Sequence, residues 1–220
     1  KEYSQIDQEA LRRGTSIYLA DRVIPMLPEK LSNGICSLNE GVVRLVLSCI
    51  MEFDKKGKLI NSSIKSGYIK SKHRMTYSNV NKIFEGNEAL IKKYSDIYPM
   101  LLNMKDLSLL LRGIREERGG LDFDIKEMKI IVDEKGVPIN VESRERGLSE
   151  MMIEDFMLAA NEAVAETLFH LKYPCCYRVH EEPNKERLAN VNNILKAIGE
   201  EIKNIDKGVK PKQLQRLMNN

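Results

Sequence analysis

The segment from Lys55 to Lys82 combines positive charge with aromatic rings. It carries eight lysines and arginines, no aspartate or glutamate, and two tyrosines, Tyr68 and Tyr77. Cations that neutralise phosphates and rings that stack on bases are what binding of single-stranded nucleic acid requires. A solvated hairpin whose strand tyrosines face the core would carry the same residues, and this segment alone favours that second interpretation.

A second pair of polar residues, Glu154 and Asn161, lies seven positions apart in a segment with helical periodicity. On a helix this spacing places both side chains on one face, about 10 Å apart. Such a pair could contact ribose hydroxyls or a base edge. A polar helix flank explains the pair equally well, because Glu150 and Asp155 are close by in the sequence.

Two short motifs remain open. Asp122 and Asp124 flank Phe123, and in an extended segment both carboxylates would share one face, but the local sequence offers no third metal ligand. Arg178 and His180 precede a helix start, where a lone histidine is more often structural than catalytic. The sequence contains no P-loop, dinucleotide-binding, serine-hydrolase or zincin motif.

The elements that must position these residues alternate between helices and antiparallel hairpins, which predicts an α+β fold and excludes a doubly wound parallel sheet. We expect Pro25 and Pro28 to prevent regular structure after the first short strand. The expected helices cover 5–13 with a stop at Gly14, 77–84 after a Thr76 cap, 87–118 with a break at Pro99, 148–172, and 184–198 after Pro183. The expected strands cover 15–19, 43–53, 59–71, 127–143 as a hairpin, and 176–181. The buried stripe of helix 148–172 is expected to comprise Ile153, Phe156, Met157, Ala160, Val164 and Leu168.

The composition narrows the class of protein. At 220 residues with 42% hydrophobic residues the chain can bury a core, and a formal charge of +3 does not indicate a polyanion partner for the chain as a whole. The four cysteines lack the spacing of zinc ligands, so we interpret them as reduced core residues. Since no long apolar run or signal peptide is present, we expect a soluble cytoplasmic protein without membrane contact.

Five stretches in one order give a more specific indication. They resemble the RNB catalytic domain of the ribonuclease II / ribonuclease R family of 3′→5′ exoribonucleases, over nearly the whole chain, and look closer to ribonuclease R. The stretches are "RGTSIYLADRVIPMLPEKLSNGICSLN", "RMTYSNV", "RGGLDFD", "MIEDFMLAANEAVA" and "YRVHEEP".

The resemblance implies a channel that admits single-stranded RNA, 3′ end first, toward Mg²⁺ ions that activate water for processive release of nucleoside monophosphates. Tyr18 matches a tyrosine that stacks on bases, and Phe123 a phenylalanine that clamps the terminal nucleotides from the other side. Tyr77 and Glu154 match the pair that favours RNA over DNA. The remaining candidate RNA-binding residues are Arg13, Asn161, Arg178 and His180.

The resemblance also implies what this span lacks. The family's metal-binding aspartates lie upstream of residue 1 and do not match Asp122 or Asp124, so we expect no catalytic or metal-binding residue here. A Ser-Pro-Ile-Arg-Arg-Tyr motif lies downstream, and cold-shock and S1-type RNA-binding domains flank the catalytic domain. Residues 1–220 are therefore expected to be the central part of an RNB domain, truncated at both ends, with a sub-boundary near 145–148.

Two functional hypotheses follow. In the first, the chain supplies the RNA channel of an exoribonuclease and is inactive in isolation. In the second, it belongs to a non-catalytic RNA-binding relative that has lost the metal cluster. A protein scaffold is a third class, for which the sequence shows no specific support.

Overall fold

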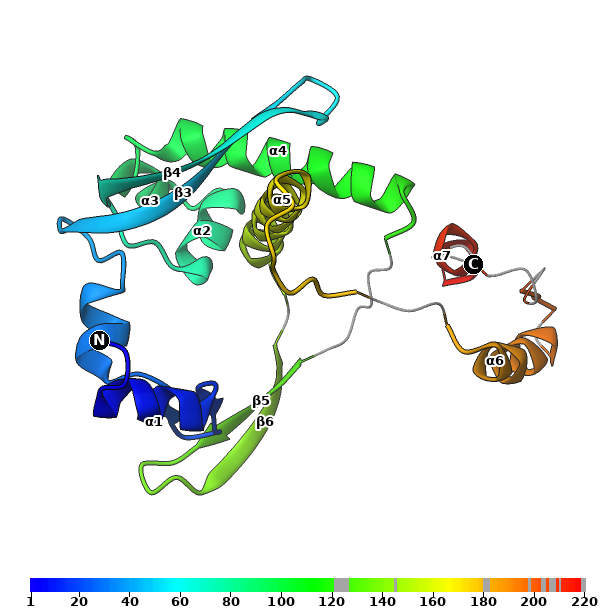
Figure 1. The fold of residues 1–220 in the computed structure, drawn as a ribbon, viewed down its shortest axis with the longest axis horizontal. Coiled ribbons are helices and arrows are strands. Elements are labelled where there is room, and N and C mark those ends of the chain that lie inside the picture. The colour runs from blue at the N-terminus through cyan, green and yellow to red at the C-terminus, as the bar shows by residue number, and fades with distance from the viewer. Residues whose placement is uncertain are drawn as a thin grey trace. The chain divides into compact units, whose positions relative to one another are not determined.

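The fold combines helices with two-stranded antiparallel hairpins, as Figure 1 shows for the computed structural model. The structure describes residues 1–120, 127–144, 146–179, 183–197, 199–202, 205, 209 and 211–218. The chain divides into two compact units. Unit 1 comprises 1–48, 64–90 and 125–147, and unit 2 comprises 49–63, 91–124 and 148–220. The α+β prediction is confirmed, and no barrel occurs within the described ranges.

Unit 1 begins with helix α1 (Gln5–Arg13). The Ser4 hydroxyl accepts a hydrogen bond from the Asp7 amide and caps its N-terminus. The helix ends at Gly14, whose left-handed φ of +68° is readily adopted only by glycine and whose amide donates to the Ala10 carbonyl at 2.9 Å. This helix and its stop confirm the sequence prediction.

The first strand is shorter than the predicted 15–19. Strand β1 (Ile17–Tyr18) pairs antiparallel with β2 (Val23–Ile24), so that Tyr18 lies opposite Val23. The turn between them is closed by the Leu19 amide, which donates to the Arg22 carbonyl at 2.9 Å. Two residues per strand suffice here because the turn, rather than a long ladder, sets the geometry.

The expectation that prolines exclude regular structure after β2 is wrong, because a π-helical turn, η1 (Lys30–Ile35), follows Pro28. The Arg44 guanidinium donates to the carbonyls of Gly34 and Ser37, each at 3.0 Å. A side chain from β3 thus satisfies acceptors that the end of η1 leaves without helical partners.

Strands β3 (Val43–Phe53) and β4 (Leu59–Lys70) form the long hairpin that the sequence predicts. Its turn is organised by one side chain, because Asp54 Oδ1 accepts hydrogen bonds from the amides of Lys56 and Lys58 at 2.8 and 2.9 Å. An aspartate that bonds the backbone two residues onward is a standard turn former.

Strands β5 (Glu127–Val132) and β6 (Pro138–Arg144) form the second predicted hairpin. It uses the same device, since Asp133 Oδ1 accepts from the amides of Lys135 and Val137 at 2.9 and 2.8 Å. The two turns share the pattern Asp-x-Lys-Gly, in which a glycine with positive φ follows the lysine.

Helix α2 (Tyr77–Phe84) begins after Thr76, whose hydroxyl accepts from the Asn79 amide at 3.3 Å. It buries Val80 and Ile83 on one face. The predicted cap and end are confirmed, and Tyr77 is the first residue of the helix.

The helical segment predicted for 87–118 is two helices, α3 (Glu88–Lys93) and α4 (Tyr98–Glu117). The break lies before Pro99 and not at it. Pro99 stands in the first turn of α4, where the amide hydrogen it lacks would have no helical acceptor.

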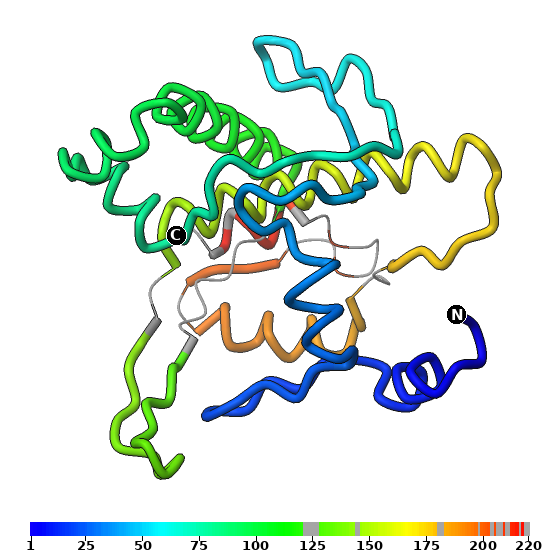
Figure 2. The backbone as a smooth tube through the Cα atoms, turned by 90° about the vertical axis from the view of Figure 1, so that its left-hand side faces the viewer, coloured from blue at the N-terminus to red at the C-terminus, as the bar shows by residue number. Residues whose placement is uncertain are grey.

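Helix α5 (Leu148–His170) packs against α4 in unit 2, and the two helices cross in Figures 1 and 2. Its predicted buried stripe is wrong for Met157, whereas the other five predicted residues are half-buried. Met157 is 59% exposed, and the fully buried positions are Ser149, Met152, Asp155 and Ala163. The true core face includes an acid, which a purely apolar pattern cannot identify.

The buried acid is matched by polar partners from α4. Asp155 Oδ2 accepts from the Ser108 hydroxyl at 2.8 Å and from Arg112 Nη2 at 2.7 Å. Arg115 Nη2 lies 3.5 Å from Asp155 Oδ1. The Asp155 side chain is 2% exposed and the Arg112 side chain 13%, so this is an internal ion pair between two helices.

The C-terminal part of unit 2 contains α6 (Lys185–Ala197) and α7 (Pro211–Met218). The strand predicted for 176–181 is wrong over 176–179, which has no regular structure; 180 and 181 lie outside the described residues. All four cysteines are free thiols, but Cys36, Cys175 and Cys176 are exposed, so the expectation of core cysteines is wrong for these three. None of the helices seen in the described ranges is long and apolar enough to cross a membrane.

We predict that Asp155→Ala lowers the free energy of unfolding of unit 2 by about 3–5 kcal/mol, because it leaves the Arg112 charge buried without its partner. Urea denaturation followed by circular dichroism measures the effect. The matched control is Glu162→Ala, which removes the exposed pair with Arg118 on the same two helices and should cost at most about 1 kcal/mol. Equal losses in the two variants would contradict an internal ion pair.

Candidate nucleic-acid interface

Tyr18, the predicted stacking residue, is presented to solvent at the end of β1. Its side chain is 79% exposed. A tyrosine usually buries its ring, so a ring this open on a two-residue strand is available to stack on a flat partner. Both neighbours across the ladder, Val23 and Ile24, are also largely exposed.

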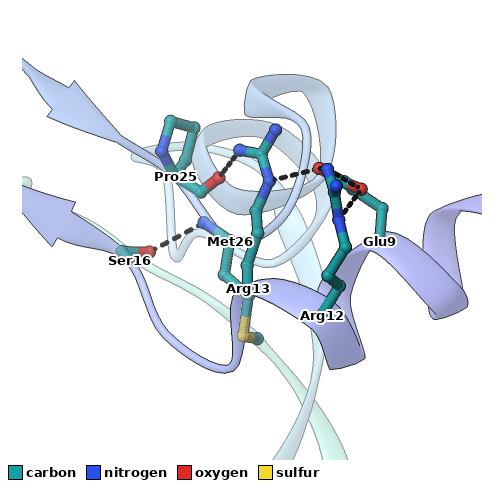
Figure 3. A network of polar contacts seen from close by, with 6 residues as sticks. All are labelled: Glu9, Arg12, Arg13, Ser16, Pro25 and Met26. Atoms are coloured by element: carbon teal, nitrogen blue, oxygen red, sulfur yellow. Dashed lines mark hydrogen bonds and ion pairs between the residues drawn. The ribbon is translucent and has the colours of Figure 1, made fainter.

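A network of polar contacts ties this hairpin to α1, as Figure 3 shows. Arg13 donates from Nε to Glu9 Oε1 at 2.8 Å and from Nη1 to the Pro25 carbonyl at 2.6 Å. The Ser16 hydroxyl accepts from the Met26 amide at 3.0 Å. The two contacts fasten the chain before β1 and the chain after β2, so the strand that carries Tyr18 is held at both ends.

Arg13 is one of the predicted RNA-binding residues, and the structure gives its guanidinium two partners within unit 1. Its place between Glu9 and the Pro25 carbonyl is that of a positioning residue for the β1–β2 hairpin. Contact of Arg13 with RNA stays a prediction.

Glu9 accepts hydrogen bonds from two arginines, Arg12 and Arg13. The bonds from Arg12 and then from Arg13 lower the pKa of the Glu9 carboxyl from 4.5 to about 2. The same contact raises the pKa of Arg12. Since the folded pKa is below the unfolded one, the contribution of Glu9 to stability is present above pH 4.5 and is lost as pH falls toward 2.

The basic segment is solvated along its whole length, because all of its lysines and arginines are exposed. Tyr68 on β4 is 76% exposed, so the alternative in which the strand tyrosines face the core is wrong for this residue. Tyr77 is also partly exposed at the start of α2. The loop before it is held by Glu40 Oε2, which accepts from the Arg74 amide at 2.9 Å.

Glu154 and Asn161 both lie on α5, and their helical placement is confirmed. Asn161 is exposed, and Glu154 is partly exposed. Glu154 Oε1 lies 3.8 Å from Arg115 Nη1, which also faces the neighbouring Asp155. Arg115 therefore contacts both Glu154 and the internal ion pair.

The other candidates are placed unevenly. Arg178 is exposed in the segment after α5, where a hydrogen bond between Tyr177 and Cys175 raises the pKa of Tyr177. Phe123 and His180 lie outside the described residues, as do Asp122 and Asp124. Unit 1 carries Arg13, Tyr18 and Tyr77, whereas unit 2 carries Glu154, Asn161 and Arg178.

Sequence reasoning missed one feature, an open groove of about 380 Å³ within unit 2. Its walls are the tip of the β3–β4 hairpin, α4 and α5, and its polar side chains include Lys56, Lys58, Arg115 and Arg118. Arg112 and Arg115 lie three residues apart on α4, and Arg118 directly follows the helix at the same spacing. This spacing is the signal that could have indicated a charged helix face.

The described residues do not fit a divalent metal ion. In the part of the chain that the structure describes, no group of three or more histidines, cysteines, aspartates or glutamates could hold one. Asp155, the buried carboxylate, is neutralised by Arg112 and Arg115. Mg²⁺ requires carboxylate oxygens that are free to coordinate it, so we derive no chemical step through a metal here.

We predict that the Glu9 carboxyl titrates well below its ordinary value, because two arginines donate to its ionised form. Nuclear magnetic resonance of the glutamate carboxyl carbons against pH measures this. Arg13→Ala should raise the midpoint toward 4.5, and so should Arg12→Ala. A midpoint of Glu9 near pH 4.5 in the wild type would show that its contacts with Arg12 and Arg13 in Figure 3 do not persist in solution.

Comparison with known proteins places the chain in a family. The RNB domain model matches residues 1–220. The chain is 46% identical over 217 residues to Ribonuclease R 1 of Lactococcus lactis and 45% identical over 219 residues to Ribonuclease R of Thermotoga maritima. Each alignment covers 99% of this chain, but only 27% and 31% of the respective relative, so the chain spans about a third of their length or less.

The structural comparison agrees. The chain superposes on Mycoplasma genitalium RNase R with a TM-score of 0.88 and 33% identity, over 100% of this chain and 34% of that one. That protein has been solved alone, with ribose-methylated single-stranded RNA and with double-stranded RNA. The likeness covers both units, the exposed Tyr18 hairpin and the α4–α5 pair alike, and the predicted resemblance is confirmed: the chain belongs to the RNB domain family and is similar in sequence and structure to ribonucleases R.

Proposed function

We propose that this chain forms the RNA-gripping part of a 3′→5′ exoribonuclease that hydrolyses single-stranded RNA processively to nucleoside monophosphates. The observation that carries the proposal is the exposed ring of Tyr18 on a hairpin held at both ends. A ring held in place loses little conformational entropy when a base stacks on it, so the stacking energy is retained. Stacking also tolerates every base, as an enzyme that degrades any RNA requires.

Selection for RNA is assigned to Tyr77 and Glu154. The ionised carboxylate of Glu154 can accept a hydrogen bond from a ribose 2′-hydroxyl, which DNA lacks. Its side chain is 41% exposed, so a strand of RNA can reach the carboxylate. In the complete enzyme Mg²⁺ would supply water activation and stabilise the leaving oxygen. We assign none of the described residues to that ion, and we propose that the isolated chain does not hydrolyse RNA.

The second candidate is a non-catalytic RNA-binding relative. Both candidates use the same Tyr18, Tyr77 and Glu154 contacts. They differ only in whether the protein that contains this chain cleaves the RNA it binds.

We predict that Tyr18→Ala and Tyr77→Ala each weaken binding of single-stranded oligo(A) by about 1–3 kcal/mol in a protein with the complete channel, since each removes one stacking ring. Fluorescence anisotropy with a labelled oligonucleotide measures the change. The control is Tyr3→Ala, which removes a more exposed ring from the same unit. Wild-type affinity in Tyr18→Ala would refute the stacking assignment.

We further predict that Glu154→Ala narrows the preference for RNA over DNA of the same sequence, because the acceptor for the 2′-hydroxyl is lost. The ratio of the two dissociation constants is the quantity to measure. Glu150→Ala, one turn earlier on α5, should leave this ratio unchanged. If the ratio is the same in Glu154→Ala and in the wild type, Glu154 does not discriminate between the sugars.

A further inference from the structure

The groove in unit 2 is built by close packing of the β3–β4 turn on α4. Gly57 at the tip of the turn has a φ of +75°, and a Cβ at this position would lie 3.0 Å from Leu110 Cγ and closer still to Ile114 Cδ1. Only glycine allows both the backbone conformation and this approach. The turn is thus seated on α4, and its side chains form one wall of the groove.

The charges around the groove are unequal. Four cations line it, Lys56 and Lys58 from the turn and Arg115 and Arg118 from α4. Its three carboxylates have partners: Asp155 pairs with Arg112, Glu162 with Arg118 at 3.3 Å, and Glu166 with His170 at 3.6 Å. The ammonium groups of Lys56 and Lys58 have no ion-pair partner among the residues that the structure describes. Lys56 and Lys58 therefore give the groove positive charge that an anion can neutralise.

The lining of the groove also contains apolar side chains and one aromatic ring. Half-buried Phe53, at the end of β3, lines it together with Leu59, Leu111, Ile114, Leu158 and Ala159. A ring beside unpaired cations is the pairing that stacks a base and neutralises its phosphate. The volume of about 380 Å³ is at the lower end of the range of about 300–1,000 Å³ for small-molecule sites.

We propose that this groove binds a nucleotide, with the base against Phe53 and the phosphate between Lys56 and Lys58. The choice of a nucleotide over other anions rests on the proposed RNA-binding function. The nucleotide is either one unit of an RNA strand or a free 5′-monophosphate. Both forms present the same base and phosphate to the groove. The groove lies on the α4–α5 pair that carries Glu154, so a strand bound there would run along the same helices.

The test compares three lysines on one turn. Lys56 and Lys58 line the groove, whereas Lys55 is exposed on the same turn and does not line it. Binding of labelled hexa-adenylate and of adenosine 5′-monophosphate by the 220-residue chain is measured at several salt concentrations. Lys56→Ala and Lys58→Ala should each weaken hexa-adenylate binding about three- to ten-fold near 0.1 M salt and reduce the slope of log K against log salt by about 0.7. Lys55→Ala should change the affinity less than two-fold.

A further variant tests the ring of Phe53. Phe53→Leu keeps an apolar side chain but removes the stacking surface, so it should weaken binding while leaving the salt slope unchanged. Circular dichroism confirms that each variant is folded. If the same variants also weaken binding of adenosine 5′-monophosphate, the groove binds free nucleotides as well as RNA. If they weaken binding of hexa-adenylate alone, the groove binds a nucleotide of an RNA strand.

Equal losses in Lys55→Ala and Lys58→Ala would show diffuse attraction and overturn the site, and so would an unchanged affinity in Phe53→Leu. These failures are distinct from failure of the proposed function. If Tyr18→Ala weakens hexa-adenylate binding while the groove variants do not, the groove is excluded and the proposed function stands. If the wild-type chain binds neither probe, the groove proposal is overturned, and a protein with the complete channel that fails to bind oligo(A) overturns the proposed function.

Discussion

The buried carboxylate of Asp155 is the constraint on which the architecture of unit 2 depends. A charge that is 2% exposed is tolerated only where its partners are in place, and here Ser108 and Arg112 both donate to one oxygen. Sliding α5 along α4 would break the hydrogen bonds of Asp155 with Ser108 and Arg112 together, so these contacts favour one register. That register sets the position of Glu154, the neighbouring residue, and of Arg115, which contacts both acids.

Unit 1 holds the hairpin that carries Tyr18 by different means. Helix α1 has no fully buried residue, and its ion pairs are exposed, where each contributes little to stability. The hairpin that carries Tyr18 is instead restrained by local geometry: a left-handed glycine before it, a proline after it, and hydrogen bonds from Arg13 and to Ser16. These contacts restrict motion without covering the ring, which is the combination that a stacking residue requires.

The features that could be predicted from the sequence are those with local causes. Gly14 ends a helix, Thr76 caps one, and Asp54 and Asp133 form turns through bonds to residues two to four positions away. The errors depend on distant partners. The π-helical turn after Pro28 is completed by Arg44, and the buried face of α5 contains Asp155 only because α4 supplies Ser108 and Arg112. The groove is formed by segments some sixty and one hundred residues apart, and no local pattern indicates it. Tyr18, Tyr77 and Glu154 came from the family resemblance, and their contacts with RNA stay predictions.

The central claim is that this chain binds RNA but does not hydrolyse it by itself. The most direct measurement combines both properties in one sample: the purified 220-residue chain is mixed with uniformly labelled oligo(A) and Mg²⁺, bound RNA is separated from free, and the products are resolved. The account predicts a bound fraction that rises with protein concentration and no release of mononucleotides. Magnesium-dependent release of mononucleotides would contradict it, because the chain would then contain a metal centre of its own, and the described residues form none.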